Sequence, residues 1–155
     1  MISPELIRRY PFFGPFSMEQ LSQIAMLGEE LEVEPGSIIF EERQPADGLY
    51  LLLNGGVDLS FKTEEAFHPK GRKEFIVGEI NPGEIFGTSA LIEPYVLKAT
   101  ARAAKTSQVV RIDAAGLRAL MDSNPQIGYL AMQQIAEVLM ERLAYTRVQL
   151  AAAWA

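Results

Sequence analysis

The fold is decided by the stretch Asn81-Pro82-Gly83-Glu84-Ile85-Phe86-Gly87-Thr88-Ser89-Ala90-Leu91, which is soon followed by Lys98-Ala99-Thr100. This order predicts a turn, a glycine at the start of a single helical turn, and a returning strand that carries one cation. A glycine lets the backbone approach an anion, and the first N–H groups of a helix are unpaired and point at it. The stretch therefore predicts a phosphate pocket built into a small β-barrel.

Length and composition describe one globular domain, residues 1–155, and exclude several kinds of site. Charged residues make up 22% and hydrophobic residues 48% of the chain, as in ordinary globular proteins. There is no cysteine and a single histidine, His68, so disulfides and thiolate metal sites are excluded. A histidine-based metal site or a hydrolase triad is not expected either. We therefore expect a binding protein rather than an enzyme, with no metal and no cofactor.

Charge and hydropathy narrow the choice of partners. The net charge of −6 and the 14 scattered Lys and Arg residues do not form the basic face that nucleic-acid binding requires, so we expect no direct nucleic-acid binding. No apolar run approaches the ~18 residues of a membrane span, and the N-terminus lacks a secretory pattern. These features favour a cytoplasmic protein with no membrane partner.

Periodicity divides the chain into three regions. Residues 1–29 contain two helix starts, Ser3-Pro4 and a capping box that begins at Ser17. Residues 30–112 are short strands separated by turn signals every ~8–12 residues, which predicts an antiparallel sandwich or barrel, with an exposed hairpin tip around His68. Residues 113–155 are helical. The predicted fold class is α+β: an antiparallel, jelly-roll-like β-roll with N-terminal helices and a long C-terminal helix.

The last helix begins at Asn124-Pro125 and runs to about Trp154, so it is roughly 40 Å long and exceeds what the domain can cover. Spacings of four and three alternate along it, which predicts a two-stranded coiled-coil seam over about three heptads: Met132, Ala136, Leu139, Leu143, Thr146, Leu150 and Ala153. We therefore expect a parallel homodimer through residues 125–154. The alternative is one wide amphipathic face that rests on the domain of its own chain.

Four motifs in order resemble the cyclic-nucleotide-binding domain family. This family includes bacterial regulators of the catabolite activator type, regulatory subunits of cyclic-AMP-dependent kinase, and gated ion channels. The motifs are Phe12-Phe13, Pro35-Gly36-Ser37-Ile38-Ile39-Phe40, Ala46-Asp47-Gly48-Leu49-Tyr50-Leu51-Leu52-Leu53-Asn54-Gly55-Gly56-Val57 and Asn81-Pro82-Gly83-Glu84-Ile85-Phe86-Gly87. Residues 81–100 are similar to the phosphate-binding cassette of the family. The resemblance implies a β-roll whose long C-terminal helix transmits ligand binding.

The resemblance also implies a ligand site, formed by Phe86, Gly87, Thr88, Ser89, Lys98, Ala99, Thr100 and Thr146. The family has a glutamate where Thr88 stands, which accepts the ribose 2′-OH, and an arginine where Lys98 stands, which clamps the cyclic phosphate. Thr88 lacks the charge-assisted bond and Lys98 lacks the bidentate fork, so we expect weak binding of cyclic AMP. Aligning Arg142-Leu143 with the arginine-leucine step of the family places Thr146 where some dimeric members contact the purine.

Two hypotheses about function remain open. In the first, the chain is a sensor domain that binds a cyclic nucleotide (cyclic AMP or cyclic GMP) or another anionic metabolite. It would signal through its long helix, either as part of a transcriptional regulator or as a stand-alone domain. In the second, the cassette has decayed and the domain is a ligand-free scaffold for dimerisation or protein interaction. The two differ in what occupies the space between Gly87 and Lys98: an anion, or bulky side chains.

Overall fold

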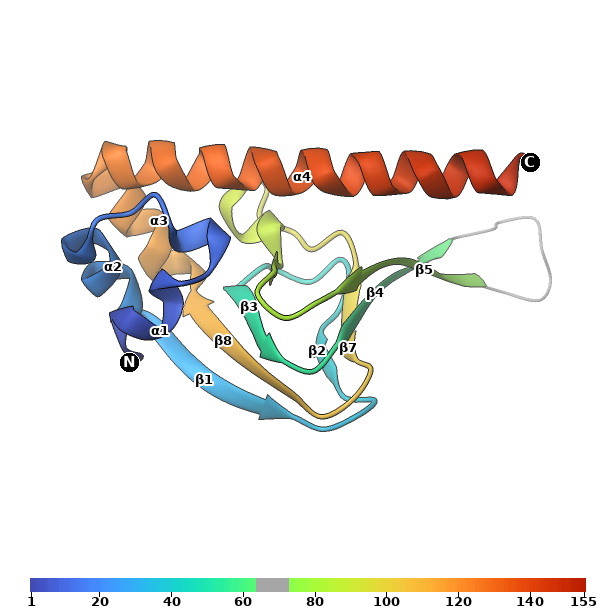
Figure 1. Ribbon diagram of the computed structural model, residues 1–155, viewed down its shortest axis with the longest axis horizontal. Helices are drawn as coiled ribbons and strands as arrows, with labels where there is room; N and C mark the ends of the chain where they lie inside the picture. Colours follow the sequence, from blue (N-terminus) through green and yellow to red (C-terminus); the bar gives the residue numbers. More distant parts are fainter. Residues whose placement is uncertain (64–72) are drawn as a thin grey trace.

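The computed structural model describes residues 1–63 and 73–155, so the hairpin tip expected around His68 lies outside the described residues. Two four-stranded antiparallel sheets form the body, with strand orders β1-β8-β3-β6 and β2-β7-β4-β5. Helices α1, α2 and α3 gather at one end of the roll, and α4 runs along the length of the molecule (Figure 1). This arrangement confirms the predicted α+β roll with helices before and after it.

The elements follow the order that the sequence predicts. The helices are α1 (Pro4–Arg8), the 3₁₀ helix η1 (Pro11–Phe13), α2 (Met18–Ala25), the 3₁₀ helix η2 (Thr88–Leu91), α3 (Ala114–Ser123) and α4 (Pro125–Ala153). The strands are β1 (Gly28–Val33), β2 (Ile38–Phe40), β3 (Gly48–Asn54), β4 (Val57–Thr63), β5 (Lys73–Ile80), β6 (Ile85–Phe86), β7 (Thr100–Ala103) and β8 (Ser107–Asp113).

Helix α2 begins at the predicted capping box. The Ser17 hydroxyl oxygen accepts from the Gln20 backbone N–H at 3.1 Å, and the Gln20 side-chain oxygen accepts from the Ser17 N–H at 2.9 Å. Two N–H groups at the helix start are therefore satisfied within four residues of chain, which is why the sequence alone predicts this boundary. The buried face of α2, which includes Leu21 and Ile24, then packs into the core at the helical end of the roll.

Most strand pairs of the roll join strands that are distant in sequence, and β4–β5 is a pair of consecutive strands. Strand β8 lies between β1 and β3, and β4 lies between β5 and β7, all antiparallel. The turn between β3 and β4 passes through Gly55 with a φ of +104°. A side chain there would collide with Ser107, whose hydroxyl accepts the Gly56 N–H at 3.2 Å, so the turn requires glycine.

The buried apolar residues form two groups. The larger one joins the helices to the face of the β1-β8-β3-β6 sheet that points away from the other sheet, and includes Phe13, Leu49 and Ile112. The smaller one fills the roll between the two sheets and includes Tyr50, Leu52, Val57, Leu59, Ile80, Phe86, Ala101 and Val109. The cassette therefore enters the body where the smaller group is packed, because Phe86 belongs to that group.

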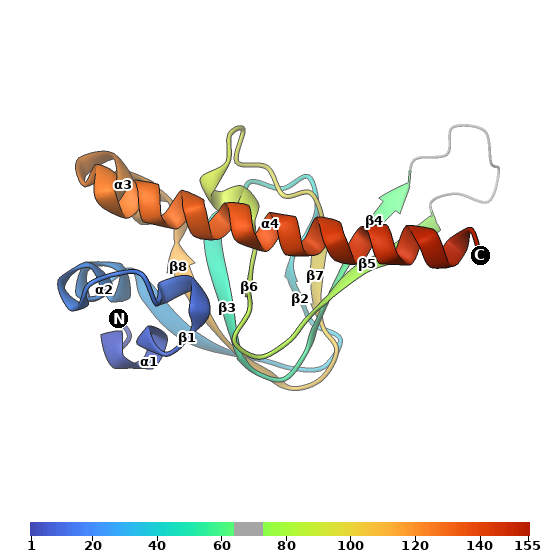
Figure 2. The same cartoon turned by 45° about the horizontal axis from the view of Figure 1, so that its top comes forward.

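Helix α4 has two halves with different surroundings. Its start is capped by Asn124, whose side-chain oxygen accepts from the Ile127 N–H at 3.4 Å, and Pro125 follows as the first helical residue. Ile127, Ala131 and Ile135 are buried against the body, whereas every residue from 143 to 155 is exposed. Figure 2 shows the second half of α4 extending past the roll beside β4 and β5.

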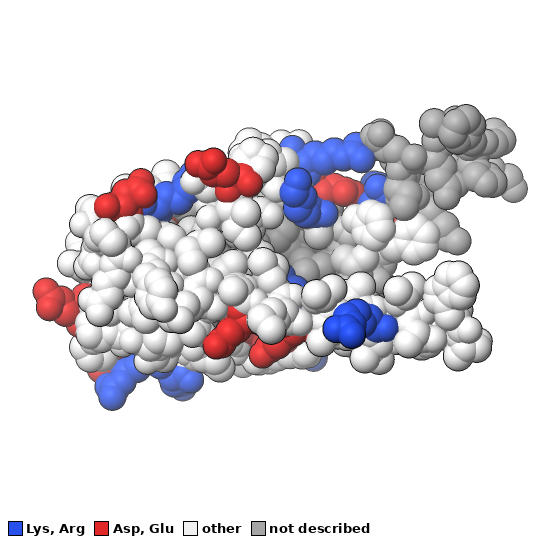
Figure 3. Space-filling model, turned by 90° about the horizontal axis from the view of Figure 1, so that it is seen from above, with Lys and Arg blue, Asp and Glu red and all other residues white. Residues whose placement is uncertain are grey.

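The seven residues of the predicted coiled-coil seam are all exposed, so this face does not rest on the domain of its own chain. Leu143 at its middle is 58% exposed and Leu150 is 58% exposed. The surface over α4 carries few charged side chains in the view of Figure 3. Ile135 and Val138, on the neighbouring stripe, pack on the body, whereas Tyr145 farther along it is exposed. No helix within residues 1–63 and 73–155 is long and apolar enough to cross a membrane.

Candidate functional site

The cassette adopts the predicted sequence of turn, glycine and helical turn. Strand β6 leads into Gly87, which has a φ of +76° and forms the N-cap of η2. A Cβ at Gly87 would lie 3.2 Å from the Gly48 carbonyl oxygen and 3.2 Å from the Tyr50 ring. Glycine is therefore required here both by the left-handed backbone and by the close approach of β3.

Aromatic rings fill the roll beside Gly87. The Tyr50 and Phe86 rings are stacked with centroids 5.3 Å apart, and Phe40 lies 5.5 Å from Tyr50 and 5.9 Å from Phe86. Phe40 Cε2 would also lie 3.3 Å from a Cβ at Gly87. Burial raises the pKa of the Tyr50 hydroxyl, so this group stays neutral. The wall behind the cassette glycine is thus apolar and densely packed.

The predicted cation lies outside the returning strand, because β7 begins at Thr100 and Lys98 lies in the bend before it. Leu97 is 5% exposed and belongs to the core, whereas the next residue, Lys98, is exposed. Ala99 is half-buried against the aromatic interior, and the Thr100 hydroxyl accepts from the Glu42 N–H at 3.1 Å. In η2, Thr88 is 8% exposed, so it is buried, and Ser89 is half-buried. The Lys98 side chain lines neither of the two cavities described below.

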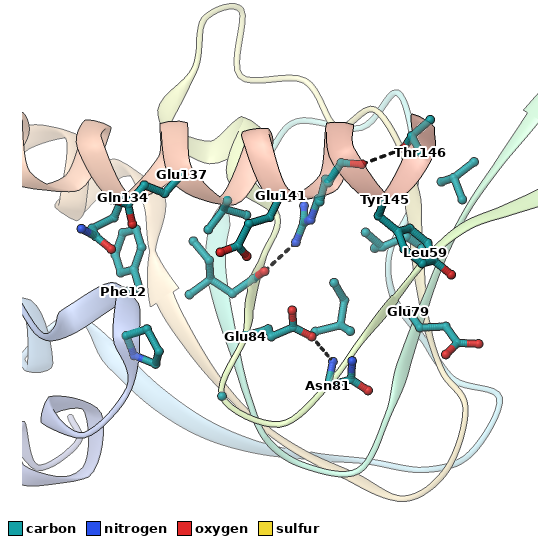
Figure 4. Close-up of a pocket in the computed structure, with 18 residues that line it drawn as sticks. Phe12, Leu59, Glu79, Asn81, Glu84, Gln134, Glu137, Glu141, Tyr145 and Thr146 are labelled. Carbon is teal, nitrogen blue, oxygen red and sulfur yellow. Dashed lines mark hydrogen bonds between the residues drawn. The ribbon is translucent and has the colours of Figure 1, made fainter. Parts of the chain in front are cut away.

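The larger cavity lies between α4 and the strand segments β4, β5 and β6, and has a volume of about 540 Å³ (Figure 4). We refer to it as the α4 cavity. It is lined by Pro11, Phe12, Leu59, Val77, Gly78, Glu79, Ile80, Asn81, Gly83, Glu84, Ile85, Gln134, Glu137, Val138, Glu141, Arg142, Tyr145 and Thr146. Of the site residues predicted from the sequence, only Thr146 lies in its wall.

The second cavity is smaller, about 170 Å³, and polar. It lies on the β2-β7-β4-β5 sheet, with Thr100 beside Glu42, Lys62 and Arg102. Thr100 and Thr146 therefore line different cavities. The predicted site residues Phe86, Gly87, Thr88, Ser89, Lys98 and Ala99 line neither.

Two arginines from the C-terminal helices hold the cassette from both sides. Arg142 on α4 donates from Nη2 to the Ile85 carbonyl oxygen over 2.6 Å, just before Gly87. Arg118 on α3 donates from Nη1 to the Ala90 carbonyl oxygen over 2.7 Å, just after the start of η2. The Arg118 guanidinium also lies 4.2 Å from the centroid of the Tyr95 ring. Charged donors form the stronger class of hydrogen bond, so the cassette is tied to both helices.

Two carboxylates lie near the guanidinium of Arg142, those of Glu84 and Glu141. Burial lowers the pKa of the guanidinium, and the nearby carboxylates of Glu84 and Glu141 act in the opposite direction. Figure 4 shows Glu84 and Glu141 projecting from opposite walls of the α4 cavity, with Glu79 and Glu137 farther apart along it. The Glu84 carboxylate also accepts from the Asn81 N–H at 2.6 Å and so closes the turn before β6.

The Thr146 hydroxyl is satisfied within its own helix, where it donates to the Arg142 carbonyl oxygen at 2.8 Å. Its oxygen lone pairs remain available to a donor in the cavity. The sequence contained a signal for this wall, because Gln134, Glu137, Val138, Glu141, Arg142 and Tyr145 recur at helical spacing beside the seam. This spacing predicts that these residues share one face of the helix, beside the seam. It does not predict which part of the roll lies opposite that face.

Comparison with known proteins agrees with this geometry. The model of the family described as the cyclic nucleotide-binding domain matches residues 30–124. A 27% identical relative, over 141 residues, is a CRP-like cAMP-activated global transcriptional regulator of Mycobacterium tuberculosis; the match covers 89% of this chain and 58% of the relative. A protein of Rhodopseudomonas palustris described as a potassium channel is 25% identical over 127 residues, which are 82% of this chain and 29% of that protein. The chain therefore spans less than two thirds of either relative.

Solved structures give the same result. A crystal structure from Geobacter metallireducens, described as a cyclic nucleotide-binding protein, is 40% identical, with a TM-score of 0.80 over 92% of this chain and 99% of the other. The sensor domain of the transcriptional regulator DNR from Pseudomonas aeruginosa shares the fold, with 22% identity and a TM-score of 0.70 over 90% of both chains. These matches, with a family model that covers more than half of the sequence, show that the chain belongs to the cyclic nucleotide-binding domain family.

Proposed function

We propose that this domain is a ligand-responsive regulator in which a small molecule bound between the roll and α4 changes the position of α4. The observation that carries the proposal is the bond from Arg142 to the Ile85 carbonyl oxygen, 2.6 Å long, in the wall of the α4 cavity. The same residue belongs to the helix, the cavity and the anchor of the cassette. A ligand that binds in this cavity would contact Arg142. Because Arg142 links α4 to the cassette, such a contact would act on the position of α4.

The proposed ligand is a cyclic nucleotide or another anionic metabolite. Its anionic group would lie at Gly87–Ser89. Its purine would extend toward Thr146. Support comes from the left-handed Gly87 and from the start of η2, the local geometry that phosphate groups use. Thr88 replaces a charged acceptor and the exposed Lys98 replaces a bidentate donor, so we propose that cyclic AMP and cyclic GMP bind weakly.

Calorimetric titration with cyclic AMP and cyclic GMP tests this affinity. We expect dissociation constants poorer than micromolar, with saturation only at higher nucleotide concentration. Amide shifts in ¹H–¹⁵N spectra should then appear both at residues 87–89 and at residues 142–146. Submicromolar binding would show that Thr88 and Lys98 suffice for the phosphate and ribose. Binding that leaves every α4 amide unchanged would contradict signalling through the helix.

The bond between Arg142 and Ile85 leads to a separate prediction. Arg142→Met keeps the length of the side chain but removes the donor, so a nucleotide bound at Gly87 can no longer act on α4 through this contact. We expect saturating cyclic AMP to shift the amides of residues 87–89 as before, while the shifts at residues 143–150 fall by more than half. Arg147→Met, exposed on the same helix, is the matched control and should respond as the unmodified chain does.

A ligand-free dimerisation scaffold is the second candidate function. The packing of Phe40, Tyr50 and Phe86 beside Gly87 favours it, because these rings occupy the interior next to the cassette. In that case, neither nucleotide should produce heat or amide shifts at millimolar concentration. The dimer would nevertheless form through the exposed seam of α4.

A further inference from the structure

The Tyr50 side chain extends from the cassette glycine to an arginine of β8. Its ring carbon Cδ2 would lie 3.2 Å from a Cβ at Gly87, and the ring is stacked on that of Phe86. The hydroxyl at the other end of the ring forms a hydrogen bond with the guanidinium of Arg111. Tyr50 is 5% exposed, so the ring is closely packed and has little room to move. One rigid ring therefore joins the wall behind the cassette to Arg111.

Arg111 lies opposite Tyr50 in the pairing of β8 with β3. Its side chain crosses β3 at Gly48, where an added Cβ would lie 2.9 Å from Arg111 Cγ and 3.0 Å from Nε. A larger residue at position 48 would therefore displace the arginine. Beyond Gly48, Arg111 Nη2 donates to the Asp47 carbonyl oxygen over 2.9 Å. The arginine side chain is only 23% exposed, so the surrounding strands fix its path.

The same carbonyl group and the same arginine contact the start of α3. Strand β8 leads directly into α3 (Figure 1), and the Ala114 N–H also donates to the Asp47 carbonyl oxygen, at 3.0 Å. Asp113 caps the helix, because its Oδ2 accepts from the Gly116 N–H at 2.8 Å. Its other oxygen, Oδ1, lies 3.9 Å from Arg111 Nη2. The first turn of α3 is thus tied to the group that holds the tyrosine hydroxyl.

The hydrogen bonds of Arg111 matter more than its ion pairs. The carboxylates of Glu29, Asp47 and Asp113 lie 3.6, 3.7 and 3.9 Å from its guanidinium, and all three are at least 47% exposed. Exposed ion pairs contribute little to stability, because water and salt screen them. Hydrogen bonds from a charged donor are the stronger class. The firm link is therefore the one from Arg111 to the Tyr50 hydroxyl and the Asp47 carbonyl oxygen.

We propose that Arg111 is a positioning residue that links the aromatic wall behind Gly87 to the first turn of α3. The inference rests on the proposed function and deepens it, because it adds a path through β3 and β8 to the direct contacts of Arg118 and Arg142 with the cassette. A shift of the backbone at Gly87 would press on the Tyr50 ring. The hydroxyl of that ring would transmit the shift to Arg111 and so to the cap of α3. All of these contacts lie within the chain, so they can be tested without a ligand.

Tyr50→Phe removes only the hydroxyl and tests the link from the side of the cassette. Hydrogen exchange is measured for each amide of the ¹⁵N-labelled chain at neutral pH. Relative to the amides of α2, which report the stability of the core, we expect those of Ala114 and Gly116 to exchange at least ~3-fold faster, because Arg111 loses the partner that fixes it. The matched control, Tyr129→Phe, removes an exposed hydroxyl that is bonded within α4 and should leave these two amides unchanged.

Arg111→Met and Arg111→Lys test the link from its centre. Methionine loses every donor, whereas lysine keeps the charge but not the planar fork. In Arg111→Met we expect the Ala90 N–H, which donates to the Gly87 carbonyl oxygen, to exchange at least ~3-fold faster relative to α2. The ¹³Cζ signal of Tyr50 should shift as well, and Arg111→Lys should recover part of both effects. The matched control, Arg102→Met, removes a guanidinium that donates to a carbonyl oxygen before β2 and should change neither.

The double variant Tyr50→Phe with Arg111→Met shows whether the two residues act as one unit. If they do, its effect on the α3 amides is no larger than that of Arg111→Met alone, whereas independent residues give effects that multiply. The inference is overturned if Tyr50→Phe leaves the α3 amides unchanged relative to α2, because Arg111 then only supports the start of α3. It is also overturned if the α2 amides accelerate equally in Tyr50→Phe, since the hydroxyl then serves general stability. The nucleotide titrations decide the proposed function separately, because they report on residues 87–89 and 142–146 of the unmodified chain.

Discussion

Leu143→Glu should convert the protein from a dimer into a monomer at micromolar concentration while its roll stays folded. Leu143 lies at the middle of the exposed seam on α4 and is 58% exposed in the single chain. In a parallel two-stranded helix pair, the same residue of each chain would face its copy. Two unpaired carboxylates would then be buried against each other, at a cost of several kcal/mol. We expect the dimer to dissociate more than ~100-fold more readily.

Sedimentation velocity of the unmodified and variant chains measures this effect, and the circular dichroism of each checks the fold. Ala144→Glu is the matched control, because residue 144 carries the same new charge one position away, on a face of α4 outside the seam. It should leave the dimer intact. An unmodified chain that sediments as a monomer would remove the dimer and, with it, any contribution of a partner helix near Thr146.

Thr88→Glu together with Lys98→Arg should tighten the binding of cyclic AMP by at least ~100-fold. Charge-assisted hydrogen bonds contribute ~1.5–3 kcal/mol each, and the two changes introduce one such acceptor and one bidentate donor. Thr88 is 8% exposed and follows Gly87, where we propose that the anionic group of the ligand lies. The new arginine would begin from the exposed position of Lys98 and would have to reach toward η2. Calorimetry of both chains measures the change.

Thr88→Gln with Lys98→Arg is the matched control, because it differs from the first double variant only in the negative charge at residue 88. It has the same length but offers a neutral acceptor, and neutral hydrogen bonds are about half as strong. We expect it to recover a smaller part of the gain. A double variant with unchanged affinity would mean that the aromatic packing beside Gly87, and not the two substitutions, limits nucleotide binding.

The sequence by itself determined the features that depend on a few neighbouring residues. The capping box at Ser17, the glycine that begins η2 and the start of α4 at Asn124-Pro125 all lie where the pattern predicted them. Each depends on hydrogen bonds or backbone angles within about four residues, so local chemistry suffices. The order of four such motifs also sufficed to predict the family, which the family model confirms over residues 30–124.

The α4 cavity was decided by the tertiary structure. Its two walls, residues 77–85 and residues 134–146, are separated by about fifty residues of sequence, and no local pattern states that they face each other. Arg142 was part of an aligned motif in the sequence. Its bond to the Ile85 carbonyl oxygen forms only because α4 packs beside β6 in the folded chain. The acidic character of the cavity likewise arises from carboxylates brought together by two distant elements.

The direction of Lys98 was decided in the same way. Side chains alternate between the two faces of an extended chain, so a shift of one residue exchanges inside and outside. Pairing of the Leu97 backbone with Arg43 and Gln44, at 2.8 and 2.9 Å, sets which of the two neighbours faces the core. It buries Leu97 and leaves Lys98 exposed. The sequence supplied a cation near the end of the cassette, and pairing of Leu97 with a segment more than fifty residues away decided where that cation points.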